Sequence, residues 1–373
     1  MRIVDWGGLG GHIEYPNAVA YCNMPMLVRV TQAEEYVGAA VTLVVNGEYY
    51  TETRELRNGE CVFDIARYAQ MAFVGKSVEY ALGDHQTHAR IAPTSQEVEI
   101  VVRMTKGSGA SEDAVRGYIC VVLGRLGIGQ SSGRSRTRKW WVRLPQSFDI
   151  IANPNTDAYI TKDGETQLLS LETPDRNAQV FVDLSKHAGL ASDNLRKARL
   201  LATEATIVQG GEVIEGDCEY NLLVDRGTSG VYLRWLDSLG QWCYYLFRVT
   251  GQNYNASVAQ EWLDGIVRDE LVPANGVYQA SGQHHQRMSE EQTISLGAKL
   301  VDAETFDYLL SLTSASLVDV MVNKEEYVAD DTDTLAPLWE RVQVVGGSYA
   351  RTAAPLQDFQ VVIKRRAQKG QML

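Results

Sequence analysis

Apolar and polar residues alternate in short runs over most of the chain, a period of two that is typical of β-strands. The stretch Gly230–Val249, GVYLRWLDSLGQWCYYLFRV, shows this best, with two apolar arms, Val231–Leu236 and Trp242–Val249, on either side of the link DSLG at 237–240. The link supplies turn-forming residues and a glycine that tolerates positive φ, so the pattern predicts a β-hairpin. Because both faces of the arms carry apolar side chains, we expect protein to cover both.

The first part of the chain, residues 1–105, has strand patterns and one helix pattern. Asn46-Gly47 and Asn58-Gly59 mark tight turns, because both residues of an Asn-Gly pair tolerate the positive φ of a type I′ turn. Asp64 is placed to cap a helix from about Ile65 to Phe73. The run EVEIVVRM at 97–104 ends this module as a strand. These elements predict a β-sandwich with a short helix on its flank.

The central part, residues 106–271, contains many short apolar runs separated by Gly, Pro, Asn and Asp. Such runs predict a sandwich or open barrel that ends with the aromatic hairpin. Lys162–Glu165 predicts a further tight turn. In the last part, residues 272–373, Asp302 is expected to cap a helix from about Ala303 to Leu312, within a β-α-β-β-β order. The fold class predicted is mainly β, with sandwich or barrel modules each flanked by a short helix.

Composition adds outer limits. A chain of 373 residues exceeds one ordinary core, so two or three domains are expected. The net charge of -12 argues against nucleic-acid binding through bulk positive charge. We expect no membrane insertion and a cytosol-like compartment, since the chain lacks a transmembrane-length apolar run and its first residues lack a signal-peptide core. The odd number of cysteines, five, predicts buried free thiols.

Searches for catalytic motifs find only weak candidates. Four segments carry residue types used in binding sites, and each has a plainer explanation; they are Gly7–Gly11, Ser192–Asn194, His284-His285 and the acidic Asp330, Asp331 and Asp333. The glycines follow no strand long enough for a dinucleotide loop, and the Ser-Asp-Asn triplet is better explained as a helix cap. Adjacent histidines on a strand point to opposite faces, and the aspartates lack the glycine and terminal glutamate of a calcium loop. We therefore expect no enzymatic activity, no cofactor and no metal.

Two further groups of residues are candidates for contacts with partners. The Gly/Ser-rich tract 127–139 carries Arg134, Arg136 and Arg138 and leads into a strand pattern rather than a helix, so a loop that orders against a partner is favoured over a phosphate or nucleic-acid contact. The rings of the central hairpin, Trp235, Trp242, Tyr244 and Tyr245, are candidates for core or subunit-interface packing, with a sugar-stacking platform as the alternative.

The chain also resembles a group of phage and prophage proteins. The residues that carry the resemblance are the hairpin at 230–247, the NGE-C-x-F-D-I element at 58–65, RKWW at 138–141 and GSYARTAAPLQDFQVVI at 347–363. These proteins are similar in organisation to the distal-tail or baseplate-hub proteins of tailed bacteriophages, which form rings between the tail tube and the tip. The resemblance implies a structural virion protein that is assembled in the host cytoplasm, with itself and other tail proteins as partners and no catalytic residues.

That implication agrees with the residue patterns, because a ring protein needs strands covered by neighbouring copies and loops that order on assembly. The basic segment Arg134–Lys139 and the acidic segment Asp330–Asp333 could meet across a subunit boundary. One alternative is a carbohydrate-binding receptor protein at the tail tip, with the Trp/Tyr cluster exposed. The other is a glycan hydrolase, since paired carboxylates need not be adjacent in sequence.

Overall fold

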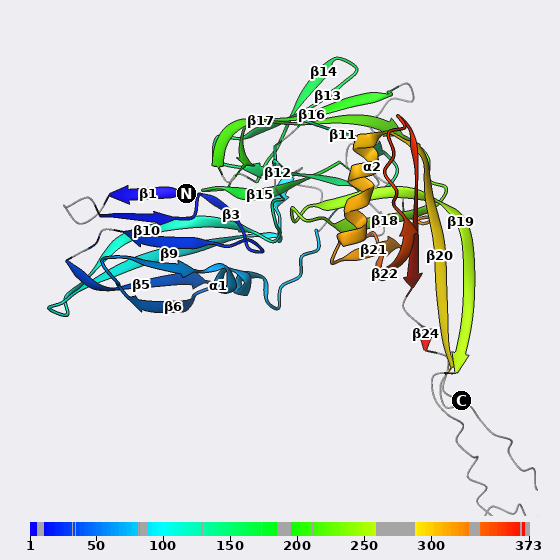
Figure 1. The fold of residues 1–373 in the computed structure, drawn as a ribbon. Coiled ribbons are helices and arrows are strands. Elements are labelled where there is room, and N and C mark those ends of the chain that lie inside the picture. Colours follow the sequence, from blue (N-terminus) through cyan, green and yellow to red (C-terminus); the bar gives the residue numbers. More distant parts are fainter. Residues whose placement is uncertain are drawn as a thin grey trace, which may run out of the picture.

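The computed structural model describes residues 1–5, 11–31, 33, 35–80, 82, 89–127, 130–133, 135–172, 174–184, 195–210, 212–258, 288–327, 336–365 and 368–369. These residues form five β-sheets with two short α-helices and two short 3-10 helices, which confirms the predicted mainly β fold. The sheets assemble into three parts, a first sandwich, a second sandwich and a closed barrel (Figure 1).

The first sandwich packs a four-stranded sheet against a five-stranded one. The four-stranded sheet runs in the order β1 (Arg2–Asp5), β2 (His12–Tyr15), β4 (Leu27–Thr31) and β7 (Cys61–Asp64). The five-stranded sheet runs in the order β3 (Val19–Tyr21), β10 (Ser111–Val122), β9 (Ser95–Lys106), β5 (Tyr36–Val45) and β6 (Glu48–Glu55). Val28 and Phe63 from one sheet and Leu43 and Ile100 from the other are fully buried between them.

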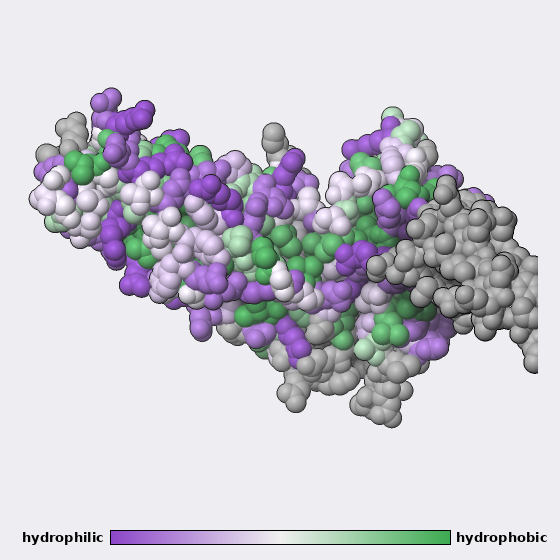
Figure 2. Space-filling model, turned by 90° about the horizontal axis from the view of Figure 1, so that it is seen from below, coloured by the Kyte–Doolittle hydropathy of each residue, from purple (hydrophilic) through white to green (hydrophobic). Residues whose placement is uncertain are grey.

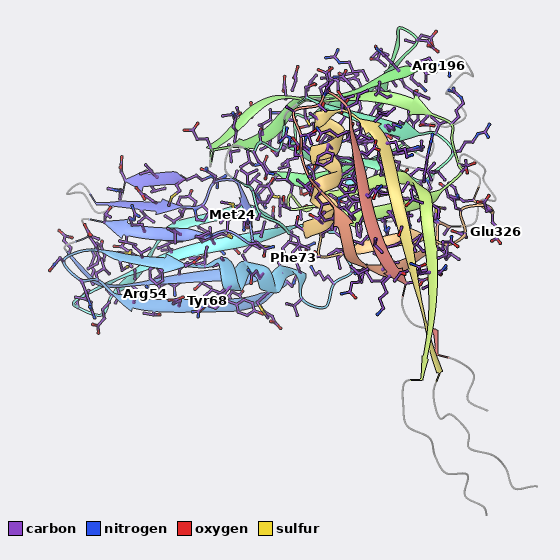
Figure 3. All side chains as sticks on the ribbon, turned by 45° about the vertical axis from the view of Figure 1, so that its right-hand side comes forward. Met24, Arg54, Tyr68, Phe73, Arg196 and Glu326 are labelled. Atoms are coloured by element: carbon purple, nitrogen blue, oxygen red, sulfur yellow. The ribbon has the colours of Figure 1, made fainter. Side chains whose placement is uncertain are left out.

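The turn and the helix predicted in this part are confirmed, but the predicted Asp64 cap is not, because the N-cap residue is Ile65 and no side chain caps it. Asn46 and Gly47 have φ values of 52° and 83° and join β5 to β6, as a type I′ turn requires. The predicted helix is α1 (Ala66–Gln70), continued by the 3-10 helix η1 (Met71–Phe73). The Asp64 carboxylate accepts hydrogen bonds from the N–H groups of Ala66 and Met26 at 3.1 Å each, so it ties the helix start to the neighbouring strand. Figure 3 shows Tyr68 and Arg54 on the flank where α1 lies.

The second sandwich uses one strand from the first third of the chain. Its five-stranded sheet runs β11 (Arg136–Trp141), β17 (Glu212–Asp225), β16 (Lys197–Gln209), β13 (Asp157–Lys162) and β14 (Glu165–Leu169). The facing sheet runs β12 (Ser147–Ala152), β15 (Ala178–Asp183) and β8 (Ala89–Ile91). The β13–β14 turn has φ values of 48° and 85° at Asp163 and Gly164, which confirms the tight turn expected there.

The barrel contains the aromatic hairpin, which is present as predicted. Its strands follow the closed order β18 (Val231–Leu236), β21 (Val318–Met321), β22 (Trp339–Ser348), β23 (Gln357–Arg365), β20 (Met288–Val301) and β19 (Trp242–Val258), and β19 pairs with both β18 and β20. The short β24 (Gln368–Lys369) adds to β20. Helix α2 (Ala303–Leu310) and the 3-10 helix η3 (Ser311–Ser314) cover one side, and Phe306 and Leu309 are fully buried against the barrel. The Asp302 carboxylate accepts from the Thr305 N–H at 2.7 Å, so the predicted cap is confirmed.

The strands β19 and β20 continue past the barrel as a two-stranded arm. Their pairing runs from Arg248↔Gly297 to Val258↔Met288, while β23 pairs with β20 only from Thr293 onward. In Figure 1 the arm points away from both sandwiches. Beyond the barrel only the two residues of β24 accompany it among the described strands.

The three parts share a small joint. Tyr21 and Val122 of the first sandwich, Ile151 and Val208 of the second, and Leu239 of the barrel hairpin form one buried cluster. At the joint the backbone of Gly240, with φ of 72°, lies so close to Leu123 that a Cβ on Gly240 would be 2.1 Å from the Leu123 carbonyl oxygen. The hairpin turn is therefore seated between the two sandwiches.

The sheets do not divide the chain at the predicted boundaries. The expected first module ends at residue 105, inside the β9–β10 pair, and the expected second ends at 271, between the paired strands β19 and β20. The hairpin was expected to complete the central part, whereas it builds the barrel together with the last strands of the chain.

Candidate functional site

The four aromatic residues singled out from the sequence are all buried, with Trp235 and Tyr245 on one face of the hairpin and Trp242 and Tyr244 on the other. Trp235, Trp242, Tyr244 and Tyr245 are exposed by 0%, 2%, 1% and 5%. The Trp235 indole N–H donates to the Ser311 hydroxyl at 2.8 Å, and the Trp242 indole N–H donates to the Val78 carbonyl at 2.9 Å. Both faces of the hairpin are covered, as expected, but by the chain itself. The predicted subunit interface is therefore wrong for these four residues, and no ring face is open for a sugar.

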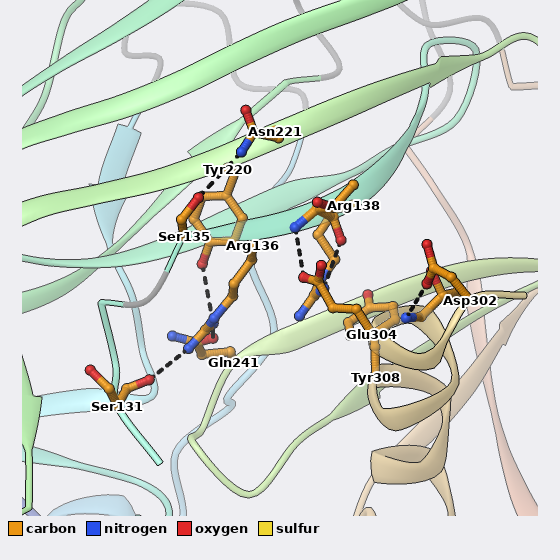
Figure 4. A network of polar contacts seen from close by, with 12 residues as sticks. Ser131, Ser135, Arg136, Arg138, Tyr220, Asn221, Gln241, Asp302, Glu304 and Tyr308 are labelled. Atoms are coloured by element: carbon orange, nitrogen blue, oxygen red, sulfur yellow. Dashed lines mark hydrogen bonds and ion pairs between the residues drawn. The ribbon is translucent and has the colours of Figure 1, made fainter. Parts of the chain in front are cut away.

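The predicted loop with Arg136 and Arg138 is also corrected, because both residues belong to strand β11, which pairs in parallel with β17. The Arg136 guanidinium donates to the Gln241 side-chain oxygen at 2.8 Å and to the Ser131 carbonyl at 3.0 Å (Figure 4). It therefore ties the second sandwich to the hairpin turn instead of reaching for another molecule.

Arg138 connects the second sandwich to helix α2. Its guanidinium carbon lies 4.1 Å from the centroid of the Tyr308 ring, and it forms an ion pair with Glu304 at 3.2 Å. The Glu304 carboxylate also accepts from the backbone N–H of Thr137 at 2.7 Å, so it covers the outer edge of β11 (Figure 4). The Arg138 side chain is 15% exposed, and this leaves little of it for a partner.

The Tyr308 hydroxyl completes a gap in the barrel's hydrogen bonding. It accepts from the Tyr244 N–H at 2.7 Å and donates to the Tyr244 carbonyl at 3.1 Å. Because the pairing of β19 with β20 starts at Arg248, Tyr308 takes the place of a strand partner at Tyr244. Burial raises the pKa of Tyr308 well above its ordinary value, so the hydroxyl keeps its proton at neutral pH.

A buried ion pair that the sequence reading missed lies on the other side of the hairpin. Arg234 pairs with Asp319 at 2.9 Å, and their side chains are 1% and 2% exposed. The two residues are direct partners in the β18–β21 ladder. Arg234 is the charged residue inside the apolar run VYLRWL, and a charge in such a run is the sequence feature that could have predicted a buried ion pair.

The other candidate binding residues predicted from the sequence lie outside the described residues. These are Arg134, residues 7–10, Ser192–Asn194, His284, His285, Asp330, Asp331 and Asp333, so the suggested pairing of the basic and acidic segments lies outside them as well. Among the residues that the structure describes, no three His, Cys, Asp or Glu side chains gather where they could hold a metal ion. In the same part of the chain, no helix combines the length and apolarity needed to cross a bilayer.

A cleft of about 440 Å³ lies between the two sandwiches. Its lining mixes charged and polar side chains, such as Glu97, Arg176 and Glu215, with apolar ones, such as Val213 and Ile214. The Arg176 guanidinium lies 3.5 Å from the centroid of the Tyr118 ring and pairs with Glu97 at 2.8 Å. One face of the Tyr118 ring is thus covered by the protein's own cation.

Comparisons with known proteins add no family. No protein-family model and no curated protein matches the chain. Two solved structures are similar over most of their length, one from a study of how a 1.5-MDa bacterial ice-binding adhesin is retained on the host cell surface and one of extracellular domains 3–5 of Drosophila OTK. The first is 11% identical and covers 89% of this chain and 96% of its own, with a TM-score of 0.19. The second is 9% identical and covers 79% and 95%, with a TM-score of 0.17, so neither carries an argument.

Proposed function

We propose that this chain is a structural component of a bacteriophage tail, a ring or hub protein that oligomerises and joins the tail tube to the tip. The observation that carries the oligomeric part is the two-stranded arm of β19 and β20. The tail assignment rests on the sequence resemblance described above.

The arm is an element that calls for a partner. A two-stranded ribbon is only marginally stable alone in water, and each of its outer edges presents unpaired backbone N–H and C=O groups. Here the ribbon extends past the barrel from Asn255↔Glu291 to Val258↔Met288, and among the described strands β24 pairs with it at just two positions. Strand addition by a neighbouring copy would pair these groups, and a closed ring repeats such a contact without leaving free ends.

The rest of the described chain fits a rigid building block. Three residues that were candidates for contacts with partners, Arg136, Arg138 and Tyr244, instead connect the parts of this chain with one another. The face of the molecule in Figure 2 shows small apolar groups among polar ones over the residues drawn in colour. This face gives little area for hydrophobic association, and we favour the backbone edges of the arm as the contact between copies.

The sugar-binding alternative loses its basis, because it required an exposed Trp/Tyr cluster and those rings are buried. We therefore propose a structural role without catalysis and do not propose a second function.

The oligomeric part is tested by light scattering and negative-stain electron microscopy of the purified chain. We expect closed rings for the natural protein and monomers for a variant in which residues 252–292 are replaced by a short Gly-Asn turn. A matched control shortens the β13–β14 hairpin at 161–166, which is another exposed ribbon tip, and should still form rings. A natural protein that stays monomeric at high concentration would contradict the proposal.

The tail assignment needs a different measurement. Antibodies raised against the chain should label one end of the tail on phage particles released from cells that carry the gene. Label on no particle would remove the tail assignment, even if the purified protein forms rings.

A further inference from the structure

A buried carboxylate lies where the three parts of the molecule meet. Asp149, on β12, is 2% exposed. Its Oδ1 accepts hydrogen bonds from the Tyr80 hydroxyl at 2.5 Å and from the Gln179 side-chain N–H at 3.2 Å. Gln179 also donates to the Gly240 carbonyl at 2.9 Å. Asp149 is thus linked to the segment that leaves the first sandwich, to β15 of the second, and to the turn of the barrel hairpin.

The other carboxylate oxygen lacks a partner in this arrangement. Asp149 Oδ2 is buried and forms no hydrogen bond of ordinary geometry with the described residues, and the backbone N–H of Trp242 stabilises the charged carboxylate only weakly. A small cavity of about 30 Å³ is lined by Asp149 together with Arg136, Ser147, Tyr220 and Asp237. A buried carboxylate oxygen without a hydrogen bond is costly when it is charged, whereas a protonated one is a donor that a single water in such a space can accept from.

We propose that Asp149 is a proton-binding site inside the joint, at which the neutral acid holds the hairpin turn firmly against the second sandwich and the ionised form loosens it. The proposal does not depend on the tail assignment or on oligomerisation. The contact between the hairpin turn and the second sandwich should therefore weaken as pH rises.

The groups around Asp149 support this assignment. Burial raises the pKa of Asp149 to about 7, and the nearby Asp237 carboxyl adds to the rise, while the hydrogen bonds from Tyr80 and Gln179 oppose it. The groups that face the same space are Tyr80, Tyr220, Tyr244 and Cys243, with pKa values that burial raises, the cations Arg136 and Arg138, and Asp237, whose pKa burial also raises. The four hydroxyl and thiol groups stay neutral near pH 7. Burial also raises the pKa of Asp237, but the hydrogen bonds that it accepts from the Leu239 and Gln241 N–H groups and the Arg136 charge oppose that rise, so the Asp149→Asn variant assigns a titration near pH 7 to one carboxyl or the other.

The sign of the effect follows from linkage. An unfolded aspartic acid titrates near its ordinary value of about 3.9. Since the folded state holds the proton to a higher pH, the contribution is fully present below the unfolded pKa and is lost as pH rises through about 7. The folded protein should therefore become less stable between about pH 4 and about pH 7.5 because of this one group, and above that range its contribution stays constant.

The test compares thermal unfolding of the natural protein, Asp149→Asn and Asp217→Asn over that pH range. Asp217 is an exposed carboxylate on β17 of the same sandwich, so its variant is the matched control. We expect the melting temperature of the natural protein and of D217N to fall with rising pH relative to that of D149N. Parallel curves for all three proteins would overturn the proposal.

Infrared spectroscopy gives a second readout in the folded protein. A carbonyl band of a protonated carboxylic acid should be present at about pH 6, disappear with a midpoint near 7, and be missing in D149N. If D149N does not fold, Tyr80→Phe serves instead. Because the Tyr80 hydroxyl stabilises the ionised form, its removal should shift the midpoint to higher pH. No band at pH 6, or an unchanged midpoint in Y80F, would contradict the assignment.

Discussion

Arg234 and Asp319 form an ion pair in the barrel wall, 85 residues apart in the chain and almost fully buried. The guanidinium lies between the rings of Trp242 and Trp339, with its carbon 4.4 Å from each centroid. Asp319 also accepts from Arg341. The carboxylate thus holds a cation between two indoles, and it joins the two halves of the barrel that are far apart in sequence.

The variant Asp319→Asn should lose about 3 kcal/mol of unfolding free energy, because it leaves the buried Arg234 charge with only the exposed Glu79 carboxylate, at 3.5 Å, as a counterion. Denaturant unfolding followed by tryptophan fluorescence measures this loss. The double variant R234M/D319L, which removes both charges, should recover most of it. Equal losses in the single and double variants would mean that packing, and not the uncompensated charge, sets the cost.

Tyr308→Phe should destabilise the protein by about 1–3 kcal/mol, because the N–H and C=O of Tyr244 lose their shared hydrogen-bond partner. Hydrogen exchange should become faster at the amide of Tyr244. The control is Tyr159→Phe, whose hydroxyl contacts the exposed Asp157 at 3.3 Å and should matter by less than about 0.5 kcal/mol. The idea fails if the Tyr244 amide exchanges at the same rate in Y308F and in the natural protein.

Gly240→Ala tests the seating of the hairpin turn. The new Cβ would meet the Leu123 carbonyl at 2.1 Å and would also sit on a backbone with φ of 72°, so we expect a loss of about 3 kcal/mol or more. Gly164→Ala is the matched control, since its φ is 85° but nothing lies within 4 Å of the added atom, and strain alone should cost about 1–2 kcal/mol. Similar melting temperatures for the two variants would show that the close approach at the joint is not required.

The thiols should react slowly in the folded protein. Burial raises the pKa of Cys120 to about 12 and those of Cys61 and Cys218 to about 11, and it raises those of Cys22 and Cys243 as well. The thiolate is the reactive form, so alkylation at about pH 8 should be slow until the chain unfolds. Mass spectrometry should count up to five added groups in denaturant. Rapid labelling of Cys120 without denaturant would contradict its burial.

Local features could be predicted from the sequence because neighbouring residues determine them. The Asn46-Gly47 turn, the Asp302 cap and the central hairpin all depend on residues within a few positions, and each is present. The two-period pattern also showed correctly that both faces of the hairpin are covered.

What covers those faces could not be predicted, because it depends on contacts between distant segments. An aromatic ribbon buried by its own chain and one buried by a second copy have the same pattern, and the structure shows the first for Trp235 and Trp242. Arg136 and Arg138 follow a Gly/Ser-rich tract that suggested a mobile loop. Their strand exists because β17, about 80 residues later, pairs with them. The Arg138 guanidinium then lies over the Tyr308 ring, and the Arg136 guanidinium donates to the Gln241 side-chain oxygen.

The path of the chain at β8 limits which segments of the gene can be exchanged by recombination. After α1 the chain leaves the first sandwich, adds Ala89–Ile91 to the edge of the second by pairing with β15, and returns to form β9. A genetic crossover that replaced everything before residue 106 would therefore also remove a strand from the neighbouring sandwich. Exchange between related genes should be tolerated only when both sandwiches are transferred as one unit.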